Sequence, residues 1–179
     1  QGGGNLLTIS GTATGDRYSQ PSAVISSATG IVEAPRPRKM IQWTSTLEPS
    51  DTGTGDLGDF TAYGVRGNLS AGSATGPHLK EIAHFSDRSP AIVKNEAVGK
   101  GTATHFAFLP GIRFRNQNPY RADAHFDSLV NFTDGSLPYL LSFLNGSGVR
   151  PRVKVSEPQV ETPLLTSDAG TVVTLLNWR

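Results

Sequence analysis

Cysteine is absent from this chain of 179 residues, which excludes disulfide bonds, thiolate zinc sites and cysteine nucleophiles. Charge is also sparse, since charged residues make up 17% of the sequence and the formal net charge is +1. We therefore expect no nucleic acid and no membrane among the partners. No apolar run approaches the roughly 18 residues that a membrane helix needs. The spacings of zinc-protease, EF-hand and phosphate-loop motifs do not occur either, so we expect neither a metal nor a cofactor.

Glycine and proline are abundant instead, with 20 and 12 residues. This composition is typical of a turn-rich fold with substantial β structure, and it disfavours coiled coils, helical repeats and a fully disordered chain. The sequence opens on Gln1 and three glycines and ends inside an apolar run, residues 171–178. We therefore expect a fragment of something longer. The composition leaves the cellular compartment open.

Short apolar runs bounded by turn residues predict most of the strands. Residues 5–10 form one such run and are expected to make a buried strand. Residues 79–85, 90–96 and 102–109 follow one another through tight turns, a pattern typical of an antiparallel meander. Residues 48–59 hold mainly Asp, Thr and Gly without core residues, and they are predicted to be a loop. Two further strands are predicted at residues 40–47 and 60–65.

Helical segments are predicted at residues 17–27, 120–132 and 136–144. Pro21 suits a first helical turn, and Asn145-Gly146 is a good stop for the last of these helices. Three strands separated by turn residues are predicted to follow at residues 149–156, 159–166 and 170–178. Because these strands come after the helices, they indicate the opening of a separate β unit.

Two stretches of the chain together resemble one family. Residues 3–18 contain Gly-Gly-Asn-Leu-Leu, then a glycine turn and Asp-Arg-Tyr. Residues 83–111 contain Ala-His-Phe-Ser-Asp-Arg-Ser-Pro-Ala, then Gly-Lys-Gly and Phe-Ala-Phe-Leu-Pro-Gly. In this order they are similar to class I glutamine-amidotransferase-like domains. The chain also resembles the degenerate versions of this domain in trehalose-utilisation-type proteins and in the trimerisation domain of bacterial β-galactosidases.

The resemblance implies an α/β fold, a flavodoxin-like three-layer sandwich of which this chain would hold the C-terminal portion. The antiparallel meander would belong to this domain, residues 1–148. Residues 149–179 would be a C-terminal β extension, the start of a possible β-sandwich. The partner implied is a missing N-terminal half or a second copy of the chain, giving a possible homo-oligomer.

The departures from the family pattern bear on function. The amidotransferase triad needs a cysteine after one strand and His-Pro-Glu after a later one. Here Ser10-Gly11 stands at the turn, and Leu109-Pro110-Gly111 stands where His-Pro-Glu would be. The resemblance therefore implies a degenerate module without glutaminase activity, acting as a scaffold, an oligomerisation domain or a carbohydrate-associated domain.

The alternative is a cofactor-free, esterase-like hydrolase acting on an ester or a similar bond. Ser10 is the candidate nucleophile, because a strand-to-turn position can expose a hydroxyl at the sheet edge. The candidate bases and orienting acids are His125, His105, Asp123, Asp16 and Asp127. Each has a structural reading beside it: a turn serine bonded to its own backbone, a strand histidine, or a polar network at a helix end.

Overall fold

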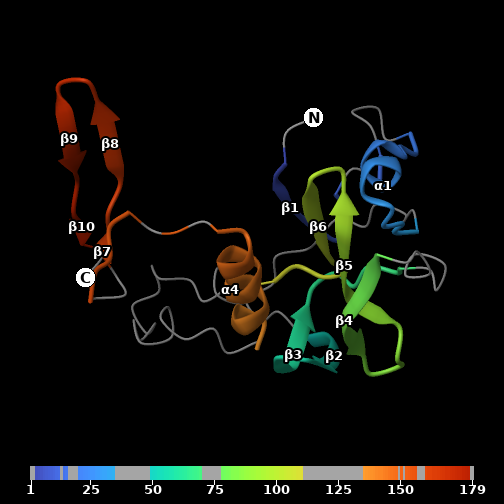
Figure 1. The fold of residues 1–179 in the computed structure, drawn as a ribbon. Helices are drawn as coiled ribbons and strands as arrows, with labels where there is room; N and C mark the ends of the chain where they lie inside the picture. Colours follow the sequence, from blue (N-terminus) through green and yellow to red (C-terminus); the bar gives the residue numbers. More distant parts are fainter. Residues whose placement is uncertain are drawn as a thin grey trace.

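A curled six-stranded sheet forms the centre of the chain (Figure 1). The computed structural model describes residues 3–12, 14–15, 20–34, 49–69, 78–110, 135–148, 150, 152–156 and 160–177. Across the sheet, the strand order is β1 (Asn5–Ile9), β6 (Gly101–Phe106), β5 (Pro90–Val98), β4 (Leu79–Phe85), β2 (Pro49–Gly55) and β3 (Gly58–Tyr63). Strands β1 and β6 run parallel, and the other neighbours run antiparallel. The sheet is therefore mixed.

Two helices and two small β ribbons complete the described part of the chain. Helix α1 (Val24–Thr29) ends at Gly30 with a left-handed φ of 70°. Helix α4 (Leu137–Gly146) carries a proline in its first turn, where no backbone donor is lost. Near the C-terminus, β7 (Val160–Glu161) pairs with β10 (Leu176–Asn177) and β8 (Leu164–Ser167) pairs with β9 (Gly170–Val173). None of the helices in the described residues is long and apolar enough to cross a membrane.

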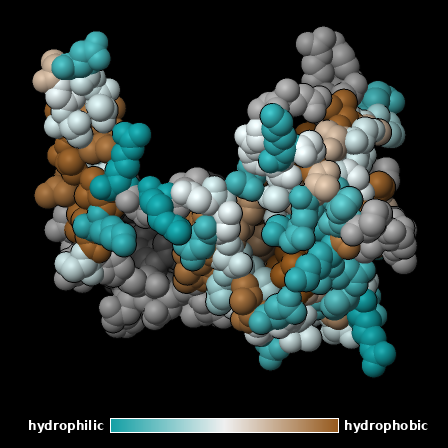
Figure 2. Space-filling model, viewed as in Figure 1, coloured by the Kyte–Doolittle hydropathy of each residue, from teal (hydrophilic) through white to brown (hydrophobic). Residues whose placement is uncertain are grey.

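The β8–β9 hairpin stands apart from the six-stranded sheet (Figure 1). Leu165 and Val172 face each other across it, and they are 70% and 61% exposed. In Figure 2 brown, apolar atoms are visible on the hairpin, whereas the main sheet on the right shows more teal, polar atoms. The hairpin thus adds no side chain to the core.

Aromatic rings fill the core between the curled sheet and α4. Phe60 and Phe108 stack with their centroids 4.8 Å apart, and Phe85 and Phe106 meet Phe108 edge to face. Tyr139 brings α4 onto this cluster, because its ring packs against Phe60 and its hydroxyl donates to the Gly58 carbonyl at 2.5 Å. The cluster holds the two halves of the sheet together.

The expected flavodoxin-like α/β sandwich is wrong. That fold needs a parallel sheet with helices on both faces, whereas the sheet here is largely antiparallel, and the described helices are α1 and α4. The predicted meander is confirmed as β4, β5 and β6. The meander strands pair antiparallel on both sides of β5, so the parallel arrangement is confined to β1 and β6.

The prediction of a loop at residues 48–59 is also wrong, because β2 and the start of β3 lie there. Strand β2 is placed between β3 and β4, and its glycines permit this close packing. A Cβ on Gly53 would collide with the Phe60 ring and the His84 carbonyl, and one on Gly55 would collide with Ala83. The described residues of 149–156 form no strand, while the elements predicted at 40–47 and 120–132 lie outside the described residues.

Candidate functional site

The carboxyl ends of β1 and β6 bring two of the predicted site residues into one cluster. Because the strands are parallel, their carboxyl ends meet at the same edge of the sheet, and Thr8 lies in register with His105. Ser10 follows directly after β1. Glu33 reaches the same edge from the segment after α1, which pairs with the chain at Leu69. The cluster therefore consists of Thr8, Ser10, Glu33 and His105.

Glu33 is the centre of this cluster. The Ser10 hydroxyl donates to its Oε1 atom at 2.6 Å, and the Gly11 backbone N–H donates to Oε2 at 2.8 Å. The Glu33 side chain is 4% exposed. Burial raises the pKa of Glu33, but contact with His105 and the hydrogen bonds from Ser10 and Gly11 outweigh it and leave the pKa below its ordinary value. Glu33 is thus a buried carboxylate that accepts hydrogen bonds from the turn after β1.

His105 lies on the other side of the carboxylate. Its Nδ1 atom is 2.8 Å from the Thr8 hydroxyl, and its Nε2 atom is 3.4 Å from Glu33 Oε2. The side chain is 7% exposed, and Nε2 has no hydrogen-bond partner in the described part of the chain. The order of groups is therefore serine, carboxylate, histidine. In a hydrolase triad the histidine stands between the other two.

A cavity of about 230 Å³ lies beside His105 and Glu33, with its remaining wall formed mainly by α1 and the residues before it. Gly67 closes the cluster from another side, because a Cβ there would collide with Glu33 and lie 2.9 Å from the Ser10 oxygen. The Ser10 hydroxyl and the Gly11 N–H are the groups that would attack a carbonyl and stabilise an oxyanion. Both donate to Glu33 instead.

The structure describes some of the predicted site residues and leaves others outside the described ranges. The structure brings Ser10 and His105 together through Glu33, whereas Asp16, Asp123, His125 and Asp127 lie outside the described residues. Sequence reasoning missed Glu33. The available signal was an acidic residue directly after the apolar pair Ile31-Val32, but its partners are distant in sequence.

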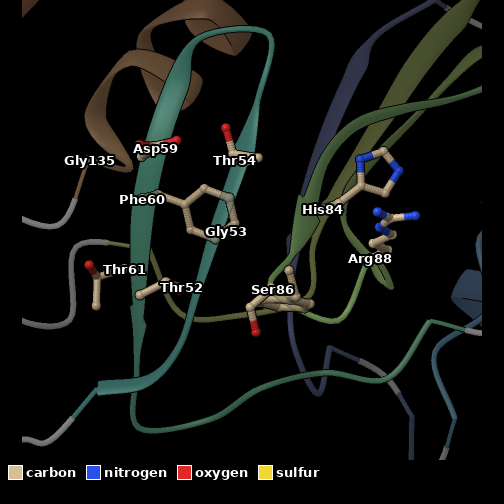
Figure 3. Close-up of a pocket in the computed structure, with 11 residues that line it drawn as sticks. Thr52, Gly53, Thr54, Asp59, Phe60, Thr61, His84, Ser86, Arg88 and Gly135 are labelled. Carbon is tan, nitrogen blue, oxygen red and sulfur yellow. The ribbon is translucent and has the colours of Figure 1, made fainter.

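A second polar site is a groove of about 850 Å³ over β2, β3 and the β4–β5 turn, shown in Figure 3. The strand registers explain its lining. Thr54 is paired with Asp59 on one side and with His84 on the other, so these three side chains share one face. Thr52 is paired with Thr61 on the same face. The groove is therefore lined by a regular polar array.

Two arginines at the β4–β5 turn are in different states: Arg66 binds turn residues, and Arg88 belongs to the turn. Arg66 is committed to the fold: it bonds Asp51, Asp87 and Ser89, and its guanidinium lies 4.4 Å from the centre of the Phe85 ring. Arg66 and Ser89 hold the pKa of Asp87 well below its usual range. Arg88 lines the groove, and in Figure 3 its side chain lies on the same side of the pocket as that of His84.

Comparison of the chain with protein-family models and with curated proteins found no match. Among the described residues, no three His, Asp or Glu side chains gather as potential metal ligands. The inference of function therefore depends on the cluster and the groove themselves.

Proposed function

We propose that the chain is a carbohydrate-associated binding module whose ligand lies in the groove over β2, β3 and β4. The observation that carries the proposal is the polar array on one face of three neighbouring strands, where Thr54 stands between Asp59 and His84. Neighbouring strands lie about 4.8 Å apart. A row of this kind offers hydrogen-bonding groups at short, regular intervals, as a chain of sugar hydroxyls requires.

The composition and size of the groove agree with such a ligand. Threonine hydroxyls donate and accept, carboxylates accept, and imidazoles do either. These groups match hydroxyls that donate and accept at once. The volume of about 850 Å³ lies within the range of about 300–1,000 Å³ that small-molecule sites occupy.

The proposal is tested by titrating the chain with neutral trisaccharides, maltotriose, cellotriose and xylotriose, in a calorimeter. The substitution Thr54→Val keeps the shape of the side chain but removes the hydroxyl at the centre of the row. We expect it to weaken binding about 5-fold, because one hydrogen bond is worth about 1 kcal/mol.

Thr166→Val is the matched control, since Thr166 is an exposed strand threonine on the distant β8–β9 hairpin. It should leave the affinity unchanged. An equal loss of affinity in both variants would refute the proposed ligand site, and so would the absence of binding by every sugar tested, neutral or acidic.

A serine hydrolase is the second candidate, and one observation favours it. The Ser10 hydroxyl already donates to a buried carboxylate at 2.6 Å, which could receive its proton. The same carboxylate occupies the Gly11 N–H, however, and the lowered pKa of Glu33 makes it a weak base. The binding module remains the better-supported function.

We expect Ser10→Ala to leave the turnover of p-nitrophenyl acetate unchanged, because the hydroxyl is committed to Glu33. The measurement is the initial rate, corrected for spontaneous hydrolysis, with His125→Ala assayed in parallel. A loss of tenfold or more in the Ser10 variant, with the folded structure intact by circular dichroism, would establish the hydrolase instead.

A further inference from the structure

We propose that the ligand of the groove is an acidic carbohydrate, a sugar bearing a carboxylate or a phosphate, and that Arg88 binds its anionic group. This inference depends on the proposed function, because it concerns the same groove. It is carried by the backbone conformation of Arg88, by its lack of partners and by its place on the groove wall.

Arg88 adopts a conformation that glycine would adopt more readily. Its φ is +68°, and among the described residues every other residue with a left-handed φ is a glycine. The turn that holds it is hydrogen-bonded on both sides, from Arg88 N–H to the Phe85 carbonyl and from Phe85 N–H to the Ser89 carbonyl, each at 2.9 Å. A side chain with a Cβ is strained in this region. Strained residues of this kind cluster at functional sites, so the conformation of Arg88 makes it a candidate for a functional role.

The guanidinium of Arg88 is unused by the fold. No described residue hydrogen-bonds to it or forms an ion pair with it, whereas Arg66 is fully engaged by Asp51, Asp87 and Ser89. Arg88 is exposed and lines the groove. The guanidinium of Arg88 is therefore available to bind a ligand in the groove, since the described residues of the fold do not engage it.

The charges around the groove indicate which end of it would bind the anionic group of the ligand. His84 is paired with Glu81 at 2.5 Å, and Asp59 lies across the pocket from Arg88 in Figure 3. An anionic group would be repelled by Asp59 and attracted to the Arg88 end. The guanidinium fork matches carboxylate and phosphate oxygens in pairs. The threonines between the two ends then face the neutral hydroxyls of the sugar.

The test compares the wild-type chain with Arg88→Gly and Arg88→Lys, using trigalacturonate, galactose 6-phosphate and the neutral trisaccharides. Arg88→Gly should raise the Tm by about 3 °C because it removes the backbone strain. The same substitution should weaken binding of the acidic sugars at least tenfold and leave the neutral trisaccharides unaffected. Arg88→Lys keeps the charge and the strained backbone, so it should bind with intermediate affinity and show no rise in Tm.

The two acidic probes distinguish the source of the anion, because the probe whose affinity falls by the larger factor in Arg88→Gly carries the group that Arg88 binds. Equal binding of acidic and neutral sugars, or an Arg88→Gly variant that keeps wild-type affinity for acidic ones, overturns this inference and leaves the proposed function standing. Absence of binding by every sugar overturns the proposed function as well. A fall in Tm for Arg88→Gly would refute the strain on which the inference depends.

Discussion

Replacement of Glu33 by alanine should lower the free energy of unfolding by about 3 kcal/mol. The carboxylate accepts from the Ser10 hydroxyl and from the Gly11 N–H, and it lies 3.4 Å from His105. The Glu33 side chain is 4% exposed, and His105 beside it is buried. Ser10, in contrast, is half-buried and Gly11 is exposed, so most of the loss arises at His105 and at the emptied site of the carboxylate. Each buried polar group left without a partner costs about 1–3 kcal/mol. Urea denaturation measures the loss.

Two further substitutions separate the causes of this loss. Glu33→Gln can still accept from Gly11 and can turn its amide towards the rotatable Ser10 hydroxyl, so about half of the loss is expected. Glu96→Gln is the control, because Glu96 is 54% exposed and paired with Lys94 and should change stability by less than about 0.5 kcal/mol. Equal effects of Glu33→Ala and Glu96→Gln would show that the cluster contributes nothing to folding.

The contribution of Glu33 also depends on pH, and the direction follows from its pKa. Because the pKa in the folded chain is below its ordinary value, the unfolded chain binds the proton more readily. The stabilisation is therefore complete above the ordinary glutamate value of about 4.3. It is lost as the pH falls from there through the folded pKa. The stability difference between wild type and Glu33→Gln should therefore shrink over that acidic range.

The strands that could be predicted were those with an apolar run of their own. The three meander strands contribute Ala83, Ile92, Phe106 and other residues to the core, and their apolar runs are visible in the sequence. Strand β2 contributes no buried side chain. Its place is set by Gly53 and Gly55, which let β4 and the Phe60 ring approach. A glycine-rich strand of this kind has the composition of a loop, which is why the prediction failed there.

The candidate site shows the same limit. Ser10 and His105 were predicted because each has chemistry of its own and a position at a strand end. Glu33, which joins them, lies 23 residues from Ser10 and has no local motif. The polar row of the groove was invisible for a related reason. Thr54, Asp59 and His84 share a face only through strand register, and no register could be assigned to a segment predicted as a loop.

The substitution Phe108→Ala should have the largest effect on stability, about 4 kcal/mol. The ring is fully buried and contacts Phe60, Phe85 and Phe106, so its removal leaves a cavity that the three remaining rings cannot close. Phe108→Leu fills most of that space and should cost about 1.5 kcal/mol. Leu165→Ala, on the exposed hairpin, should cost less than about 0.5 kcal/mol.

The Phe108 substitution also connects the core to the groove. Phe60 stacks on Phe108 and at the same time lines the groove, so its position under Thr54 and Asp59 depends on the ring behind it. The neutral trisaccharides should therefore bind Phe108→Ala more weakly than wild type, measured at a temperature where the variant is still folded. Phe108→Leu should keep most of the wild-type stability and most of the wild-type affinity. If Phe108→Ala lowered stability but left the affinity intact, the polar row would be held by strand pairing alone and the aromatic core would have no part in shaping the ligand site.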